Sequence, residues 1–241
     1  MNSPTEASRA AGSSDLVRGV VKRLAQIIIV FFIQGAILFG AAGQLGWVWA
    51  WVFLGISILS VFINGAILLR KSPEMIAERG NSKLTKTWDK IVASLYSFSL
   101  FLAVPLVAAL DMRLGWSQSL GSVWHIGAGV LLVVALALAG WAMIENAFFS
   151  TAVRIQTDRG QTVCRTGPYR LVRHPGYVGF IFQSIATPVL LGSIWALLPA
   201  VVAALALIVR TFFEDRTLQA ELHGYSQYAQ EVRYRLLPGI W

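Results

Sequence analysis

Residues 24–69 read LAQIIIVFFIQGAILFGAAGQLGWVWAWVFLGISILSVFINGAILL, with no charged side chain between Arg23 and Arg70. A helix that crosses the hydrocarbon core of a bilayer needs roughly 20 apolar residues, so this stretch is long enough for two such helices. The segment GQLG, residues 43–46, contains two glycines and offers a turn between them. The stretch therefore predicts two membrane-spanning helices joined by a tight connection.

Three more stretches lack charged side chains, namely residues 91–110, 114–144 and 174–209. Their lengths predict one, one and two further helices. Only 13% of the chain is charged, against about 25% in an ordinary soluble domain. A soluble protein with a core of buried helices is disfavoured, because such runs recur along the whole chain. We predict an all-α, polytopic membrane bundle of about six helices.

The last uncharged stretch divides at Gly192 and Ser193. Both halves look short for a bilayer, which predicts a C-terminal helical hairpin that is tilted or packed inside the protein. The positions of the basic residues indicate which end of the bundle faces the cytoplasm. Every lysine and arginine except Arg113 lies in the tails or in the second and fourth connections of the six-helix count. Because basic residues stay on the cytoplasmic side, we expect both termini there.

The net charge of +8 is then a sign of membrane topology, and it gives no reason to expect nucleic acid as a partner. We divide the chain into a disordered tail (1–20), three scaffold helices (21–120) and a catalytic region (121–241). Polar and charged residues become dense from Glu145 onward. The loop 150–173 and the tail 210–241 flank the hairpin on one face, so a functional site is expected where they meet at the membrane surface.

The loop ends in TGPYRLVRHPGYVG, residues 166–179. Pro168 and Pro175 restrict the backbone and move the preceding residues out of helical geometry. Backbone amides at such a helix start bind anions and carboxylates, and His174 and Tyr177 would project from the same place. The alternative is an interfacial anchor, in which the arginines face lipid headgroups and the tyrosines lie in the aromatic belt.

A second polar cluster follows the hairpin. Arg210 and Glu214 are four residues apart and share a helical face, and Tyr225 and Tyr228 are three apart. The alternative is a surface helix with solvated ion pairs. Cys164 is the single cysteine, which excludes disulfides and cysteine metal clusters. The histidines lack neighbouring ligand residues, so no metal is expected.

Together, Gly-Pro-Tyr, Arg-His-Pro-x-Tyr, an apolar hairpin, an acidic pair and Tyr-x-x-Tyr resemble the isoprenylcysteine carboxyl methyltransferase family, with a broader likeness to phospholipid methyltransferases. The motifs cover about residues 140–241, and we see none in the first 120. The resemblance implies a cytoplasmic pocket for S-adenosyl-L-methionine, formed by the loop before the hairpin and the C-terminal segment. It also implies a lipophilic small-molecule or lipidated acceptor, and contact with the surrounding membrane lipids.

The resemblance also implies functional residues. The cofactor-binding residues would be Gly167, Tyr169, Arg173, His174, Pro175, Tyr177, Glu214, Asp215, Tyr225 and Tyr228. The catalytic residues would be Arg210, which would orient an acceptor carboxylate, and Glu214. The chain departs from the family pattern in two ways: Asp215 stands where the family has glutamate, and the spacing from Leu218 to Tyr225 is shorter. Glu221 could therefore take over an acidic role.

The acceptor chemistry stays open at this point. Carboxyl O-methylation needs no general base, because a carboxylate is ionised at neutral pH. Lipid N-methylation would need a proton removed from the amine, for which Glu214 and His174 are the candidates. Two other classes remain: a non-catalytic membrane protein whose basic loops bind anionic lipids, and a sterol-type reductase on a related helical scaffold.

Overall fold

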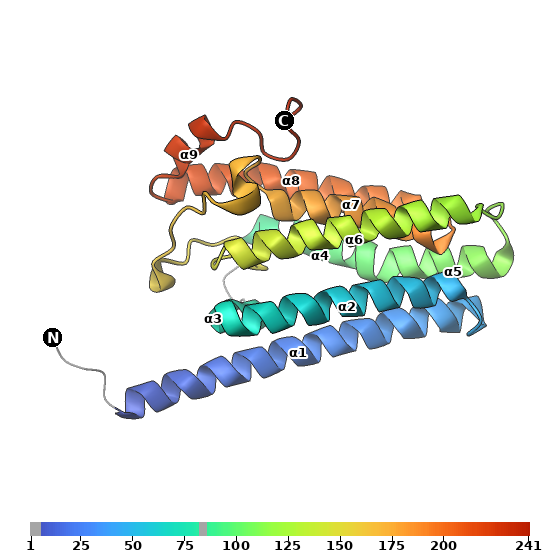
Figure 1. The fold of residues 1–241 in the computed structure, drawn as a ribbon, viewed down its shortest axis with the longest axis horizontal. Helices are drawn as coiled ribbons and strands as arrows, with labels where there is room; N and C mark the ends of the chain where they lie inside the picture. Colours follow the sequence, from blue (N-terminus) through green and yellow to red (C-terminus); the bar gives the residue numbers. More distant parts are fainter. Residues whose placement is uncertain (1–5, 82–85) are drawn as a thin grey trace.

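The computed structural model describes the backbone of residues 6–81 and 86–241, and the side chains of residues 14–80 and 86–241. Within these ranges the secondary structure is helical (Figure 1). The helices are α1 (Glu6–Ala42), α2 (Val48–Lys71), α3 (Pro73–Asn81), α4 (Thr87–Phe98), α5 (Val104–Leu114), α6 (Ser122–Glu145), α7 (Pro175–Leu191), α8 (Leu197–Glu221) and α9 (Tyr225–Glu231).

Five of the helical segments are long and apolar enough to cross a membrane: Ser14–Ala42, Val48–Lys71, Thr87–Leu114, Ser122–Glu145 and Leu197–Glu221. The predicted helical membrane bundle is thereby confirmed. The remaining predicted helix, the fifth along the chain, is α7, which has 17 residues. At roughly 1.5 Å per residue it is about 25 Å long, somewhat less than the bilayer core of about 30 Å.

The hairpin forms as predicted, with its turn at Gly192, which adopts a φ of +82°. Only its first half is short. The second half, α8, has 25 residues, because it continues past Arg210 to Glu221. The expectation that both halves are short is therefore wrong for α8. A helix can continue through charged residues at the membrane boundary when those residues form ion pairs. In α8, Arg210 pairs with Asp89 and Asp215 pairs with Arg173.

Three other features were not expected from the sequence. Helix α1 begins at Glu6, inside the stretch 1–20 expected to be a disordered tail, and residues 1–5 lie outside the described residues. A nine-residue helix, α3, occupies the second connection. A π-helical turn, Ser99–Ala103, joins α4 to α5 within one span.

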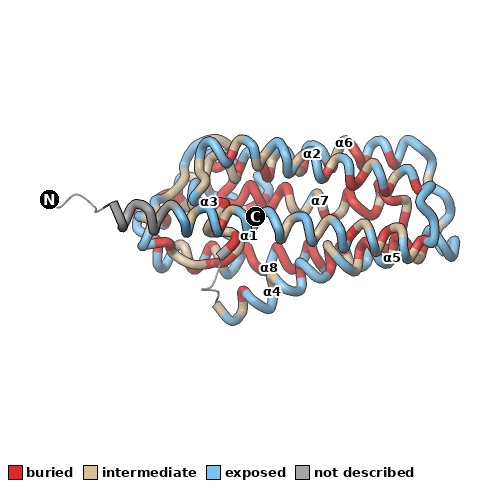
Figure 2. The backbone as a smooth tube through the Cα atoms, turned by 90° about the horizontal axis from the view of Figure 1, so that it is seen from below, coloured by how far each residue is buried: buried red, intermediate tan, exposed pale blue. Residues whose placement is uncertain are grey.

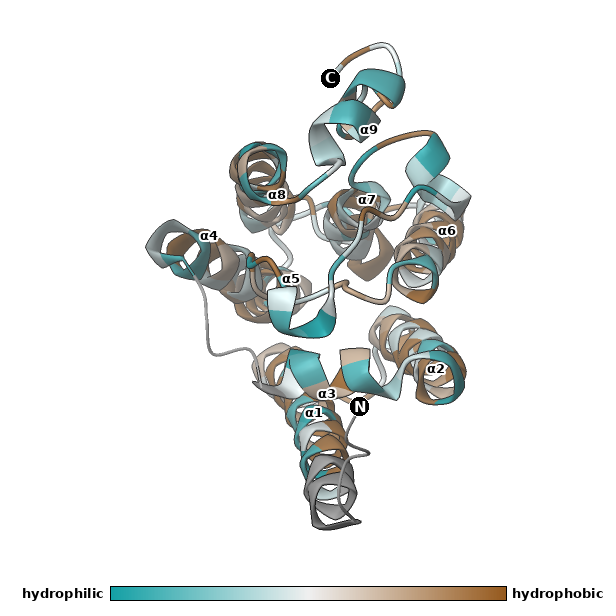
Figure 3. Ribbon diagram, turned by 90° about the vertical axis from the view of Figure 1, so that its left-hand side faces the viewer, coloured by the Kyte–Doolittle hydropathy of each residue, from teal (hydrophilic) through white to brown (hydrophobic). Residues whose placement is uncertain are grey.

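The helices lie side by side along one long axis, with α1, α2 and α3 on one side and α6, α7 and α8 on the other (Figure 1). Seen from the end, α7 lies between α6 and α8 (Figure 3). The buried positions face the inside of the bundle and the exposed ones face outward (Figure 2). Exposed apolar side chains such as Phe32, Phe62 and Val123 would contact lipid.

Small residues allow the closest helix contacts. A Cβ at Gly179 of α7 would lie 2.5 Å from the carbonyl oxygen of Ala135 on α6. A Cβ at Gly80 of α3 would lie 2.5 Å from the carbonyl oxygen of Gly19 on α1. Glycine at these positions lets the backbones approach, which is typical of packing between membrane helices. The first contact fixes α7 against α6, and the second holds α3 against α1.

The two polar segments that flank the hairpin meet at one end of the bundle. The amide of Arg173 donates to the carbonyl of Tyr234 at 2.9 Å, and the amide of His174 donates to that of Arg235 at 3.0 Å. The C-terminal segment is thus hydrogen-bonded to the residues just before α7. The predicted convergence of these segments is present.

Candidate active site

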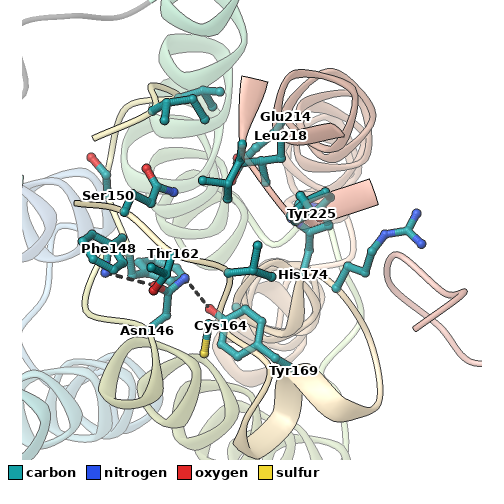
Figure 4. Close-up of a pocket in the computed structure, with 18 of the residues that line it drawn as sticks. Asn146, Phe148, Ser150, Thr162, Cys164, Tyr169, His174, Glu214, Leu218 and Tyr225 are labelled. Carbon is teal, nitrogen blue, oxygen red and sulfur yellow. Dashed lines mark hydrogen bonds between the residues drawn. The ribbon is translucent and has the colours of Figure 1, made fainter. Parts of the chain in front are cut away.

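A cleft opens where the loop after α6, the start of α7 and the segment α8–α9 come together (Figure 4). The space between its walls is about 810 Å³, a volume that includes the open solvent at the entrance. Seven of the predicted site residues line the cleft: Tyr169, Arg173, His174, Tyr177, Glu214, Tyr225 and Tyr228.

Glu214 of α8 and Tyr177 of α7 meet at one wall of the cleft, where the Tyr177 hydroxyl donates to Glu214 Oε2. The rings of His174 and Tyr177 are stacked, with centroids 5.8 Å apart and planes 11° apart. Glu214 is therefore oriented by a neighbour from the next helix, and its carboxylate remains able to accept hydrogen bonds from a ligand.

Asp215, the next residue along α8, has a different place. It is fully buried and does not line the cleft. Its carboxylate accepts hydrogen bonds from Arg173 at 2.7 and 3.1 Å and from the Nε of Arg235 at 2.8 Å. It also accepts from the Tyr225 hydroxyl at 3.0 Å, and His174 Nε2 lies 3.4 Å away. Asp215 thus holds three cleft residues from behind, and a direct cofactor contact by Asp215 stays a prediction.

Arg173 connects Asp215 to the C-terminal segment. One of its terminal nitrogens donates to the carbonyls of Ala229, Val232 and Arg233 at 2.8–3.3 Å. Arginine near the end of a helix satisfies carbonyls that have no partner within the helix. The guanidinium therefore fixes the end of α9 relative to α7, while the residue also lines the cleft.

Three tyrosines, Tyr169, Tyr225 and Tyr228, also line the cleft. The Tyr228 hydroxyl donates to the carbonyl of Tyr169 at 2.7 Å, and that of Tyr169 donates to the carbonyl of Ala142 at 3.3 Å. Burial raises the pKa of all three phenols of Tyr169, Tyr225 and Tyr228, and the Asp215 carboxylate further raises the pKa of Tyr225. These side chains stay neutral at physiological pH and present ring faces that can hold a cation.

Gly167 and Pro175 shape the wall without being among its lining residues. Gly167 has a φ of +55°, and a Cβ there would lie 2.5 Å from Glu145 Cγ. Only glycine adopts this turn at low cost. Pro175 is the first residue of α7, where its missing N–H is not needed. Their predicted part in cofactor binding stays a prediction.

Arg210 does not line the cleft either. Its Nε donates to Asp89 Oδ1 at 2.7 Å, and its Nη2 donates to the carbonyl of Thr151 at 2.7 Å. Its guanidinium carbon lies 5.7 Å from the centroid of the Tyr177 ring. Arg210 thus stands behind Tyr177 with two of its nitrogens engaged, and its predicted catalytic role remains untested.

Sequence reasoning missed Asp89 and Asn146. Asp89, on α4, is fully buried and also accepts from the amide of Val153 at 2.8 Å. Asn146 lines the cleft just after α6, and its side chain donates to the Tyr169 hydroxyl at 3.4 Å. No local pattern marks either residue. Glu221, considered as a substitute acid, forms an ion pair with Lys86 instead and does not line the cleft.

Comparison with known proteins agrees with the geometry. Residues 119–221 match the model of the Isoprenylcysteine carboxyl methyltransferase (ICMT) family. Protein-S-isoprenylcysteine O-methyltransferase B of Arabidopsis thaliana is 26% identical over 170 residues, which make up 65% of this chain and 80% of that protein. Protein-S-isoprenylcysteine O-methyltransferase of Homo sapiens is 30% identical over 130 residues, or 52% of this chain and 44% of that protein.

The chain thus covers less than half of the human relative and most of the plant one. A match over 65% of the chain extends into the first 120 residues, so the resemblance is wider than the sequence motifs indicated. The family match falls on α6, α7, α8 and the loop between them, which supply most of the cleft. The chain is therefore similar to the isoprenylcysteine carboxyl methyltransferase family over residues 119–221, and it is 26–30% identical to the two relatives over 52–65% of its own length.

Proposed function

We propose that this protein uses S-adenosyl-L-methionine to methylate the carboxylate of a lipophilic acceptor of the isoprenylcysteine class. The observation that carries the proposal is the cleft itself. It joins Glu214 and Tyr177 to three tyrosine rings, at the end of a membrane bundle where the basic residues gather. The names of the two relatives point to the same chemistry.

The residues of the cleft fit this methyl donor. Glu214 can accept hydrogen bonds from ribose hydroxyls or from an α-amino group. The rings of Tyr169, Tyr225 and Tyr228 offer faces for the sulfonium cation. The amide side chain of Asn146, just after the end of α6, offers the cofactor a further polar group. When bound, the cofactor supplies a methyl group on positively charged sulfur, so that an O–CH₃ bond forms as the S–CH₃ bond breaks.

The protein's own part in this reaction is alignment and exclusion of water. An acceptor carboxylate is already ionised at neutral pH, so no side chain has to remove a proton. Holding the two reactants in line removes much of the entropic barrier, and a dry site strengthens the attraction between carboxylate and sulfonium. The position at the membrane boundary allows a lipid chain to enter between helices while the polar group reaches the cleft.

Two measurements test this function. Isothermal titration of the protein in detergent should show binding of S-adenosyl-L-methionine. Incubation with radiolabelled cofactor and N-acetyl-S-farnesyl-L-cysteine should give a product that releases its label in mild base, as a methyl ester does. A base-stable product on a lipid amine would replace this function with N-methylation, and absence of cofactor binding would exclude both.

We also propose that the cleft and both termini face the cytoplasm, because the basic residues of the described part of the chain, Arg113 excepted, lie at that end. The test uses a Cys164→Ser background with one new cysteine at an exposed position, Lys71→Cys or Ser119→Cys. A membrane-impermeant maleimide added to intact expressing cells should label Ser119→Cys and leave Lys71→Cys unlabelled. Labelling of Lys71→Cys before the cells are opened would reverse the orientation.

A further inference from the structure

Arg79, in the last turn of α3, carries a charge that the described part of the protein does not neutralise. Its Nη1 is closed off from solvent and has no hydrogen-bond partner. Leaving a buried charged donor unpaired is costly. The guanidinium carbon lies 5.4 Å from the ring centroid of Phe149, and Phe149 lines the cleft. Arg79 does not itself line the cleft, but its guanidinium packs on the ring of a residue that does.

Three acids on α3, α4 and α8 accept hydrogen bonds from other groups. Glu78, beside Arg79 on α3, accepts from Arg154 at 2.9 and 3.0 Å. Asp89 accepts from Arg210 and from a backbone amide. Glu214 accepts from Tyr177. None of these three carboxylates is hydrogen-bonded to Arg79.

The surroundings of Arg79 are positive and apolar. Burial, followed by the charges of Arg23 and Arg210, lowers the pKa of Arg79 to about 9. The missing partner of Nη1 and the two neighbouring positive charges agree with a guanidinium that has no counter-ion in the described part of the protein. Arg210 is close enough for its charge to act on Arg79, so an anion near both guanidinium groups would be attracted by two cations, and more strongly at a poorly solvated place than in water.

This place also suits the rest of a lipophilic acceptor. Phe149 faces Phe180 of α7 at a centroid distance of 6.4 Å, and Phe180 is 6.4 Å from Tyr96 of α4. These rings form a row that leads from the cleft into the membrane part of the bundle. An apolar chain could lie along the row while its anionic end reaches Arg79.

We propose that Arg79 is the residue that binds the acceptor carboxylate, with Arg210 as its second cation. The proposal rests on the proposed function and makes it more specific. The carboxylate would then bind mainly to Arg79, whose Nη1 has no hydrogen-bond partner, and less to Arg210, which already donates to Asp89 and to the carbonyl of Thr151. Arg79 lies outside residues 119–221, so the N-terminal half would contribute to substrate binding.

The test separates charge recognition from folding. Full-length protein in neutral detergent, held with S-adenosyl-L-homocysteine to prevent turnover, is titrated with N-acetyl-S-farnesyl-L-cysteine and with its uncharged carboxamide. Wild-type protein should prefer the carboxylate by about tenfold or more. Arg79→Gln should reduce this preference to below about threefold, and Arg79→Lys should retain part of it.

Two controls accompany the titration. Arg70→Gln, at an exposed arginine at the end of α2, should keep the full preference. The melting temperature of Arg79→Gln should not fall, because the substitution removes an unpaired buried charge.

An unchanged preference in Arg79→Gln, in a protein that still methylates, would overturn this proposal and leave the proposed function intact. Wild-type protein that binds neither compound would overturn both. If phosphatidylglycerol in nanodiscs removes the preference of the wild type, Arg79 is a lipid headgroup contact, and the proposal is again overturned.

Discussion

Asp215→Asn should lower the free energy of unfolding by about 3–5 kcal/mol, the usual cost of removing one partner from a buried ion pair. The substitution leaves the buried Arg173 without its counter-ion and also weakens the contacts of Arg235 and Tyr225. Cofactor binding should be lost with it, since three cleft residues depend on this carboxylate. The unfolding midpoint in detergent, followed by intrinsic fluorescence, measures the first effect, and titration calorimetry the second.

A matched control is Glu221→Gln, in the same helix. Glu221 pairs with Lys86 at the surface, where its side chain is 46% exposed. Surface ion pairs contribute little, so its midpoint should barely move. A double variant, Arg173→Met with Asp215→Leu, should be less destabilised than the two single variants combined, because neither charge is left alone. If the losses of stability in the two single variants simply added up in the double variant, Asp215 would not be the buried partner that holds Arg173 in place.

Glu214→Gln should instead weaken cofactor binding by about 10- to 100-fold, with little change in the unfolding midpoint. The carboxylate lines the cleft, and a hydrogen bond to a charged group contributes about 1.5–3 kcal/mol. Titration calorimetry with S-adenosyl-L-methionine gives the affinity. Glu231→Gln is the control, since Glu231 pairs with Arg165 on the surface of the same end of the bundle.

The critical result is the difference between Glu214→Gln, which should lower affinity for the cofactor, and Asp215→Asn, which should lower the stability of the fold. Affinity that is unchanged in Glu214→Gln would remove Glu214 from the cofactor site. A large fall in stability would mean that Glu214 supports the fold, as Asp215 does. Both residues were predicted as cofactor contacts, and the structure places them on different sides of the wall.

The positions of the membrane helices could be predicted because they depend on the local absence of charged residues. Stretches without charge, each long enough to cross a bilayer, locate the helices, because a spanning helix satisfies its backbone hydrogen bonds within its own segment. The short helix α3 has too few residues to show a clear pattern, and its position depends on the contact between Gly19 and Gly80. It was therefore missed, and Arg79 with it.

The sequence by itself determined that this chain is a helical membrane bundle, and its Gly-Pro-Tyr and Arg-His-Pro-x-Tyr motifs identified the loop that lines the cleft. Only the tertiary structure decided which charged side chain has which task. Glu214 and Asp215 are adjacent, and a helix turns them about 100° apart, so the rotation of α8 decides which one faces the cleft. Arg210 is engaged by Asp89, which is 121 residues away in the chain, and Arg79 keeps a free nitrogen. Such pairings depend on distances between elements, which no local pattern of residues encodes.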